Sequence, residues 1–445
     1  MMKDQGWKKT IGNLHRSAAA FIKWVMLGSA VGSIVGVMGV LFHFSVEWAT
    51  EMRQQHSWLL FLLPLGGVVI ALLYRQTGME KDMGTNTILE AVRGEHPLRL
   101  RTAPLIFVST VITHLFGGSS GREGAALQIG GSMGARLADW INLDQKEHQM
   151  MIMCGMSSCF AALFGTPLTA TIFAIEVISV GEMYYAALLP CITGALIGYG
   201  LAAVFHIPPT AFAISGVPHL GLASVGQVIL LSLFPKDAQW APIDRLSGGE
   251  KRRLFLLSIL CALLSIIFCW AMHAASKAYA KVFPNRLLRA ACGGLIVVAM
   301  SLLIGTSDFN GAGMQVIQRA MQGEADWYAF LFKLLLTALG AGFKGGEIVP
   351  TFFVGATFGC VVGPLLGMDP SFAAAVGLVA LFCGVINCPV ASFTLSVELF
   401  GGEGVIFFGI ASVIGYMLSG YSGLYHGQKI IYSKLEPQMI DVHCD

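Results

Sequence analysis

The chain has 445 residues, of which 55% are hydrophobic and only 12% are charged, and its formal net charge is +2. Soluble globular proteins carry about 25% charged residues, so this composition excludes a soluble enzyme, and we expect no nucleic-acid partner. With a mean hydropathy of +0.69, the chain is predicted to be an all-α integral membrane protein in a lipid bilayer.

The N-terminal segment, MMKDQGWKKTIGNLHR, is basic and precedes the first apolar run, which predicts a cytoplasmic N-terminus in a multi-pass protein of the cell inner membrane. That run is too long for a cleaved signal peptide, so we interpret it as a retained helix. The apolar runs that predict helices are residues 18–46, 58–75, 103–116, 148–165, 167–180, 184–205, 254–280, 286–305, 327–342, 371–386, 389–400 and 403–420. A spanning helix needs about 20 residues. Because several of these runs are shorter, we expect broken and re-entrant helices whose ends face protein or a cavity.

A glycine-rich segment after the third predicted helix, GGSSGREGAALQIGGSMGA, contains Gly121, Arg122, Glu123 and Gly124. A carboxylate at membrane depth is costly unless it is paired, faces water or moves with an ion or proton. At the first turn of a helix, the same carboxylate lies where backbone N–H groups attract anions. Glu123 and an anion are therefore predicted to compete for one helix N-terminus, which is the arrangement of an anion transporter gated by a protonatable side chain.

Two stretches of the chain resemble each other, CFAALFGTPLTATIFAIEVI at 159–178 and FCGVINCPVASFTLSVELFG at 382–401. Each runs nine positions from a proline to a glutamate, Glu176 in the first and Glu398 in the second, and a glycine-rich segment with a glutamate precedes each. We interpret them as parts of two inverted repeats with the ion site between them, although chance similarity of small-residue helices is the alternative. Glu176 and Glu398 themselves are predicted to be structural acids at helix ends. The predicted organisation is a cytoplasmic segment at 1–17, a first half at 18–205, a connection at 206–253, a second half at 254–430 and a short tail at 431–445.

The connection contains an unexpected motif within residues 228–260, the segment Leu246-Ser247-Gly248-Gly249-Glu250. It resembles the signature segment of ABC ATPases, but the chain has no G-x-x-x-x-G-K-[ST] loop to cradle a nucleotide phosphate. We therefore expect no bound nucleotide and interpret the segment as a polar connection between the halves. The ten cysteines are scattered without a C-x-x-C pair, so we expect buried small hydrophobic side chains, no metal site and no cofactor.

Several motifs in order, GREG before an apolar helix, G-T-P-L-T-A-x-x-F-A-x-E, G-x-x-x-P and a late S-G-x-Y, resemble the CLC family of chloride channels and proton-coupled anion transporters. The resemblance covers residues 20–430. It implies a CLC-type fold of inverted repeats with broken and re-entrant helices. It also implies a homodimer in which each subunit has its own anion pathway, with helix N-termini converging on a central anion site.

The departures from the family pattern are equally informative. Met83 stands where the family's first anion loop has serine, and Glu347 enters the loop that usually reads G-x-F-x-P. Val177 occupies the position at which the family has its internal proton-relay glutamate. Ala125 stands in place of the proline in the family's GREGP motif. Together these departures resemble the fluoride/proton antiporter branch, although members of that branch carry threonine where Val349 stands. The chain is therefore predicted to export fluoride, using the proton gradient.

The resemblance also assigns roles to residues. Glu123 and Glu347 are the proton-coupling or gating groups, with a helix-capping acid as the simpler reading of each. The residues predicted to bind the anion are Met83, Gly84, Asn86, Gly121, Arg122, Gly124, Ile348, Val349 and Tyr425. For Arg122 a structural charge partner is the favoured alternative, for Met83 core packing, for Asn86 a helix cap, and for Tyr425 the neighbouring Tyr421 is the rival.

Three functions remain open from the sequence. The first is fluoride/proton exchange, and the second is chloride/proton exchange or passive chloride conduction on the same fold. Met83, Glu347 and Val177 argue against the second. The third is a regulatory or ATP-linked membrane protein, which the missing phosphate loop disfavours. The expected partners are a fluoride or chloride anion, protons, the lipid bilayer and a second copy of the chain.

Overall fold

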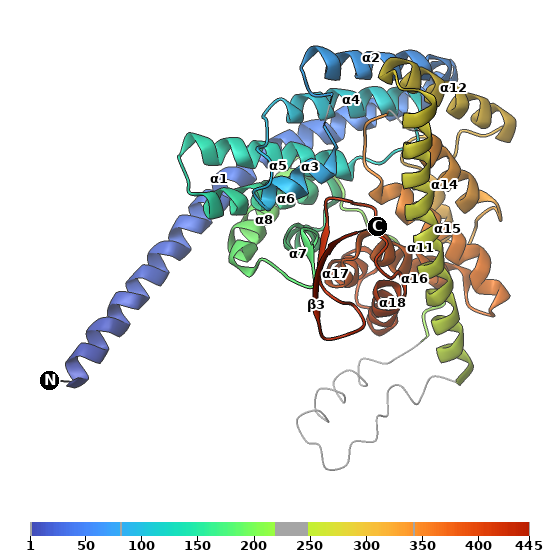
Figure 1. Cartoon of the computed structure of the whole chain (residues 1–445). Helices are drawn as coiled ribbons and strands as arrows, with labels where there is room; N and C mark the ends of the chain where they lie inside the picture. The colour runs from blue at the N-terminus through green and yellow to red at the C-terminus, as the bar shows by residue number, and fades with distance from the viewer. Residues whose placement is uncertain (1, 81, 219–247, 341–342, 445) are drawn as a thin grey trace.

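The computed structural model describes residues 2–80, 82–218, 248–340 and 343–444 (Figure 1). The helices of the N-terminal part are α1 (Met2–Gln55), η1 (Ser57–Leu62), α2 (Leu63–Gln76), α3 (Thr85–Val92), α4 (Thr102–Phe116), α5 (Glu123–Trp140), α6 (Gln145–Phe164), α7 (Pro167–Glu176), η2 (Tyr185–Ala187) and α8 (Leu188–Val204). The helices of the C-terminal part are α11 (Gly248–Val282), α12 (Arg286–Ile304), α13 (Met314–Met321), α14 (Ala329–Leu339), α15 (Ile348–Leu365), α16 (Pro370–Ile386), α17 (Pro389–Phe400) and α18 (Val405–Leu418).

Most of the predicted helical runs are confirmed, including the break before Pro389. The prediction of residues 18–46 was too short, because α1 continues to Gln55. The short helices α3 and α13 lie outside the predicted runs, because each has only eight residues and carries polar side chains. Most of the ABC-like segment lies outside the described residues, and from Gly248 onward it is helical as the start of α11.

Helices α5 and α6 pack in close contact because glycines face each other. A Cβ built on Gly130 would lie 2.1 Å from the carbonyl oxygen of Gly155, and the reverse distance is also 2.1 Å. Helices α15 and α16 pack equally closely at a glycine, since a Cβ on Gly359 would lie 2.1 Å from the Ala373 carbonyl oxygen. Small residues let helix backbones approach closely in membrane proteins, so the same packing rule operates in both parts of the chain.

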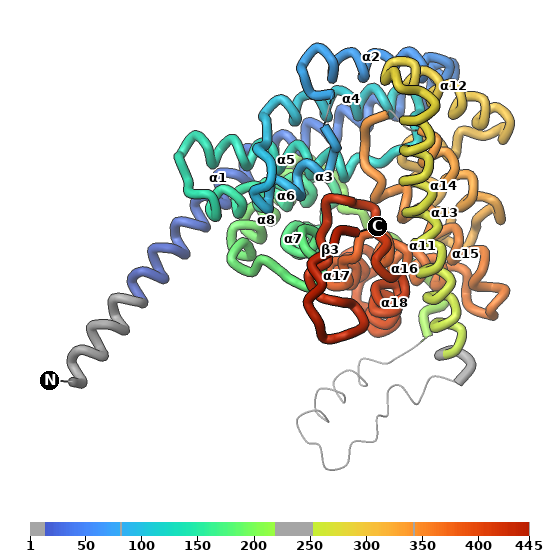
Figure 2. Tube along the Cα trace, viewed as in Figure 1, coloured from blue at the N-terminus to red at the C-terminus, as the bar shows by residue number. Residues whose placement is uncertain are grey.

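Helices α7 and α17 lie side by side and cap each other (Figure 2). The Glu176 carboxylate, at the end of α7, accepts hydrogen bonds of 3.0 and 2.7 Å from backbone N–H groups in the first turn of α17. The Glu398 carboxylate, near the end of α17, accepts hydrogen bonds of 2.9 and 2.8 Å from the first turn of α7. These are the otherwise unsatisfied donors of a helix N-terminus. The exchange gives both glutamates a structural role, and it supports the interpretation of two related halves.

A small sheet near the C-terminus is not indicated by the apolar pattern. Strand β1 (Ser179–Val180) pairs in parallel with β2 (Lys429–Tyr432), which pairs antiparallel with β3 (Met439–His443). The predicted tail therefore forms a hairpin that begins four residues after Tyr425, and β1 anchors it to the end of α7. This anchoring holds the last segment of the predicted site against the helical body.

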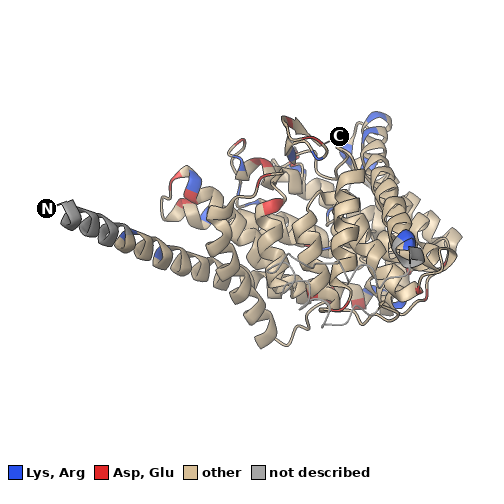
Figure 3. Cartoon of the chain, turned by 90° about the horizontal axis from the view of Figure 1, so that it is seen from below, with Lys and Arg blue, Asp and Glu red and all other residues tan. Residues whose placement is uncertain are grey.

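In the part of the chain that the structure describes, six helical segments are long and apolar enough to cross a membrane. They are Leu14–Gln55, Ser57–Gln76, Tyr185–Val204, Arg252–Val282, Arg286–Ile304 and Ile348–Leu365. In Figure 3 most of the ribbon coloured as Lys, Arg, Asp or Glu lies along two opposite edges of the molecule, and the helices between these edges are mostly uncharged. Because an uncharged belt of this kind matches the hydrocarbon layer of a bilayer, the chain is an integral membrane protein.

Candidate functional site

The N-termini of α5 and α15 meet at two glycines. The backbone N–H of Gly121 donates to the carbonyl of Gly346 over 2.5 Å, and the N–H of Gly346 donates to the carbonyl of Gly121 over 2.7 Å. A Cβ built on Gly346 would lie 2.5 Å from the backbone nitrogen of Gly124, so the approach requires glycine. Two helix N-termini, each with unsatisfied N–H groups, therefore converge on one place and create a site of positive potential.

Glu123 is the first residue of α5, and its side chain folds back onto the start of its own helix. One carboxylate oxygen, Oε2, accepts a 3.0 Å hydrogen bond from the backbone N–H of Arg122. The other, Oε1, lies 3.9 Å from the Arg122 guanidinium and has no hydrogen-bond partner among the described residues. The side chain is only 1% exposed. A buried carboxylate thus occupies the helix end with half of its hydrogen-bonding capacity unused.

A cavity of about 420 Å³ opens on one side of this helix end, which we call the inner cavity. Five of the predicted site residues line it: Met83, Gly84, Asn86, Glu347 and Tyr425. A neighbouring cavity of about 520 Å³ shares Asn86 and Glu347 with it. The inner cavity is also lined by Thr85 and Gln128, which the sequence analysis did not single out. The position of Gln128, one helical turn after Gly124, was the signal that could have found it.

Tyr425, and not its rival Tyr421, lines the inner cavity. The Tyr425 hydroxyl is buried, and the Thr85 side chain beside it interacts with it. Tyr421 is more than a third exposed, and its hydroxyl lies 3.0 Å from the Ser433 hydroxyl. Tyr425 and Thr85 both line the cavity, so their hydroxyl groups are the ones placed to contact a ligand there.

The loop before α3 is held by its own polar contacts. The Met83 side chain is half exposed on the cavity wall, whereas its backbone N–H donates to the Thr87 hydroxyl over 3.1 Å. The Thr87 hydroxyl in turn donates to the Asp82 carboxylate over 3.2 Å. The Lys344 ammonium lies 3.4 Å from the same carboxylate. Because its N–H is already satisfied, Met83 offers the cavity its thioether and not a backbone donor.

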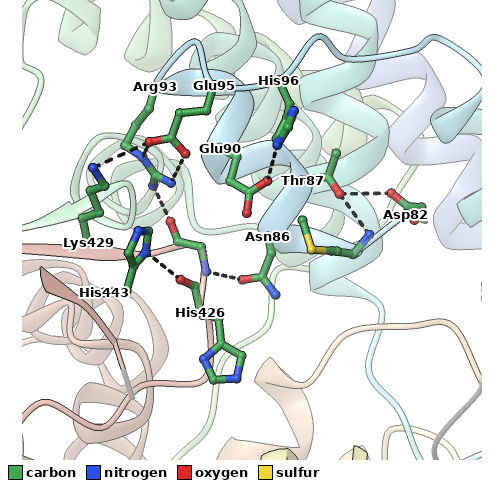
Figure 4. A network of polar contacts seen from close by, with 12 residues as sticks. Asp82, Asn86, Thr87, Glu90, Arg93, Glu95, His96, His426, Lys429 and His443 are labelled. Atoms are coloured by element: carbon green, nitrogen blue, oxygen red, sulfur yellow. Dashed lines mark hydrogen bonds and ion pairs between the residues drawn. The ribbon is translucent and has the colours of Figure 1, made fainter. Parts of the chain in front are cut away.

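Polar contacts also fasten α3 to the segment that follows Tyr425 (Figure 4). The Asn86 side-chain oxygen accepts a 2.8 Å hydrogen bond from the backbone N–H of Gly427, and the Arg93 guanidinium donates to the Gly427 carbonyl. Glu95 bridges Arg93 and Lys429 at the exposed end of this network. Since the Asn86 oxygen is bound to Gly427, its NH₂ group has no acceptor among the described residues and remains available on the cavity wall.

Glu347 precedes α15 and lines both cavities on this side. The positive charge of Lys344 acts on its carboxylate. Glu347 and Tyr425 line the same inner cavity, and Glu123 begins the helix whose N-terminus meets that of α15.

A third cavity, of about 440 Å³, lies beyond the opposite side of Glu123, next to the end of α1, and we call it the outer cavity. Arg122 and His114 line it, and the Arg122 guanidinium lies 3.2 Å from the His43 ring nitrogen Nδ1. Glu123 lines neither the inner nor the outer cavity. Arg122, directly before it, lines the outer cavity, and Gln128, further along α5, lines the inner cavity. Glu123 therefore lies between residues that border the two cavities, and we call this buried region the barrier.

Four predicted anion-binding residues also line neither cavity: Gly121, Gly124, Ile348 and Val349. They are buried within the same barrier, in the first turns of α5 and α15 or directly before them. These residues would contact a bound anion through their backbone groups at the helix ends. Among the described residues, no three His, Cys, Asp or Glu side chains gather as a metal site.

Known proteins of one family resemble this chain along most of its length. The family model for voltage gated chloride channels matches residues 66–420. A "Chloride/fluoride channel protein" from Pseudomonas syringae pv. tomato is 31% identical over 93% of this chain and 87% of its own length. An "H(+)/Cl(-) exchange transporter ClcA" from Yersinia pestis bv. Antiqua is 22% identical over 92% of this chain and 86% of its own.

Solved structures agree with this likeness. The crystal structure of a CLC-type fluoride/proton antiporter superposes with a TM-score of 0.82 and 27% identity, covering 92% of this chain and 98% of that one. A slow cyanobacterial Cl⁻/H⁺ antiporter has a TM-score of 0.69 at 18% identity, covering 89% and 94%, and shows the shared fold. The convergent helix N-termini, the buried glutamate between two cavities and these matches lead to one conclusion: the chain belongs to the CLC family of voltage gated chloride channels.

Proposed function

We propose that this protein is a fluoride/proton antiporter, which exports fluoride by using the inward movement of protons. The observation that carries the proposal is the position of Glu123. Its carboxylate is buried at a helix N-terminus between two cavities, and one of its oxygens has no hydrogen-bond partner among the described residues. An anion at this helix end would use the same N–H donors as the carboxylate.

Competition for these donors would link the two ions. When Glu123 is ionised, its charge and that of an anion repel each other, so both cannot occupy the helix end. Protonation removes the charge of the side chain, weakens its hold on the N–H groups and lets an anion take its place. Each ion therefore shifts the balance between two states of the same site, and this coupling is what exchange requires.

The wall of the inner cavity supports fluoride as the anion. Fluoride is small and strongly hydrated, so a site must replace its water with hydrogen-bond donors. The Asn86 NH₂ group, which has no acceptor among the described residues, lies on this wall together with the Tyr425 hydroxyl and its neighbour Thr85. A 31% identical relative and a 27% identical structural neighbour are both named for fluoride.

We assign the second carboxyl group, Glu347, to the proton path. It lines the inner cavity and acts electrostatically on the same tyrosine hydroxyl as Glu123. Val177, where the family's internal glutamate would follow, is fully buried and its carbonyl accepts a 3.0 Å hydrogen bond from Gln428. Protons would then leave Glu123 toward the inner cavity by way of Glu347.

The test is transport by the purified protein in liposomes. A fluoride gradient should drive proton movement in the opposite direction, recorded with a fluoride electrode and a pH electrode in the same vessel. Chloride supplied at the same concentration should move more slowly. A clear preference for chloride would replace this proposal with chloride/proton exchange, and anion flux without proton movement would indicate a channel.

We further propose a homodimer in the cell inner membrane with a cytoplasmic N-terminus. The basic N-terminal segment supports the orientation, and family membership supports the dimer. The mass of the detergent-solubilised protein, measured by light scattering, would test the dimer; a mass of one chain would refute it. Accessibility of a cysteine introduced near the N-terminus would test the orientation.

A further inference from the structure

Arg53, near the end of α1, is a buried cation without a counter-ion among the described residues. The residue is only 8% exposed, and it lines the outer cavity. Its Nε–H group is buried without a hydrogen-bond acceptor among the described residues, and no carboxylate in the described chain lies within 4.0 Å of its guanidinium. The C-terminal end of α1 compensates part of this charge. A buried charge that lacks a paired group is nevertheless costly.

A second unsatisfied donor faces the same cavity. The side-chain oxygen of Asn310 accepts a 2.9 Å hydrogen bond from the Ser301 hydroxyl, which fixes the orientation of the amide. Its NH₂ group is buried and has no acceptor among the described residues. A Cβ built on Gly117 would lie 3.1 Å from Arg53 Cδ and 3.2 Å from Asn310 Nδ2. The two donors therefore flank the same glycine at the floor of the cavity.

Further positive charge lies behind this floor. The Lys333 side chain is completely buried, and its ammonium donates to the carbonyls of Phe309 and Gly311, over 3.0 and 2.6 Å. These two residues are the direct neighbours of Asn310 in the chain. No carboxylate among the described residues neutralises Lys333. Arg122 adds a guanidinium to the cavity wall.

The acidic residues of the outer cavity do not cancel these buried charges. Glu47 and Glu51 are exposed, so water screens them, and Glu47 lies 3.4 Å from His43. Asp308 forms an ion pair with Arg319 on the surface. The floor of the cavity is therefore cationic and rich in unused donors, while its rim is acidic and solvated.

We propose that Arg53 and Asn310 bind a small monovalent inorganic anion in the outer cavity, at a site distinct from the helix end that Glu123 occupies. The Arg53 Nε–H and the Asn310 NH₂ group would donate hydrogen bonds to it, and the charge of Lys333 would add long-range attraction. This site would hold an anion beyond the Glu123 barrier. It does not depend on which halide the protein transports.

Bromide is the probe that locates the site, because its anomalous scattering identifies it in a crystal. Crystals of the full-length protein soaked in sodium bromide should show an anomalous peak between Arg53 and Asn310. Arg53→Gln should remove that peak, whereas Arg136→Gln should retain it. Arg136 is a matched control, since it also loses one positive charge but is half exposed and paired with Asp139. Absence of the peak in the parent, or its persistence in Arg53→Gln, would overturn the proposal.

A second variant, Asn310→Asp, tests the same proposal if Arg53→Gln does not fold. Asn310→Asp places a carboxylate beside Arg53 and so supplies a counter-ion within the protein, which should leave the protein folded and weaken bromide binding in the cavity. In calorimetric titration with bromide, the outer site of a folded variant should bind about tenfold to a hundredfold more weakly than in the parent, the loss expected for one charged hydrogen bond. Bromide bound in the outer cavity of Asn310→Asp with parental affinity would contradict the assignment.

Discussion

The contact between the two glycines at the helix ends gives the sharpest structural prediction, for the variant Gly346→Ala. The added Cβ would lie 2.5 Å from the backbone nitrogen of Gly124 and 3.2 Å from that of Glu123. Ordinary contact begins at 3.4 Å, so the two segments must part by about 0.9 Å. Because the obstacle is backbone, no side-chain rotation can relieve it.

The expected loss of stability follows from the hydrogen bonds that this separation breaks. The two hydrogen bonds between Gly121 and Gly346, of 2.5 and 2.7 Å, would stretch beyond the usual limit of about 3.2 Å. Each backbone hydrogen bond contributes about 1 kcal/mol net, and overpacking costs about 1–3 kcal/mol. We therefore expect a loss of roughly 3–5 kcal/mol in the free energy of unfolding, together with displaced N–H donors at the site.

The assay is thermal unfolding in detergent combined with fluoride efflux from liposomes. Gly346→Ala should melt at a lower temperature, and its efflux should fall at least about tenfold, the effect of 1.4 kcal/mol on the transport barrier. Gly200→Ala, on α8, is the matched control, because a Cβ there meets no atom within 4 Å. Parental melting and efflux in Gly346→Ala would refute the claim that the two helix ends form one site.

Three further variants test separate parts of the account. Glu123→Gln should abolish proton movement, because the side chain no longer titrates; pH-electrode recordings with unchanged proton flux would remove its assigned role. Met83→Ser should weaken the preference for fluoride over chloride, since a hydroxyl donor returns to the cavity wall, and an unaltered flux ratio would count against Met83. Glu398→Gln should lower the free energy of unfolding by about 0.5–2 kcal/mol through loss of a charged cap on α7, while selectivity measured by flux stays parental; a changed ion selectivity would contradict a purely structural role.

The sequence predicted the helical membrane fold well, because the apolar runs are long and their breaks fall at glycine and proline. The proline at 389, for example, marks the start of α17. The short helix α3 was missed, because eight mixed residues give no clear apolar period. The C-terminal hairpin was also missed, since its pairing with β1 joins segments about 250 positions apart, and no local pattern encodes such a contact.

Motifs indicated which residues gather at the inner cavity, but not the geometry of the helix ends beside it, and the roles of these residues stay predictions. Met83, Asn86, Glu347 and Tyr425 were expected to lie together, and they line one cavity. The backbone pairing of Gly121 with Gly346 and the burial of the Tyr425 hydroxyl beside Thr85 depend on tertiary contacts that a linear pattern does not specify. The burial of Arg53 could not be predicted from the sequence, because a single arginine near a helix end usually faces solvent.

The central claim is that the Glu123 carboxylate and an anion alternate at one helix end. Its most direct test is the fluoride affinity of the purified protein, measured by titration calorimetry at alkaline and at acidic pH, in the parent and in Glu123→Gln. Protonation should free the site, so the parent should bind fluoride more tightly at acidic pH, and Glu123→Gln should bind tightly at both. Fluoride affinity that is independent of pH in the parent, or equally pH-dependent in Glu123→Gln, would contradict the claim.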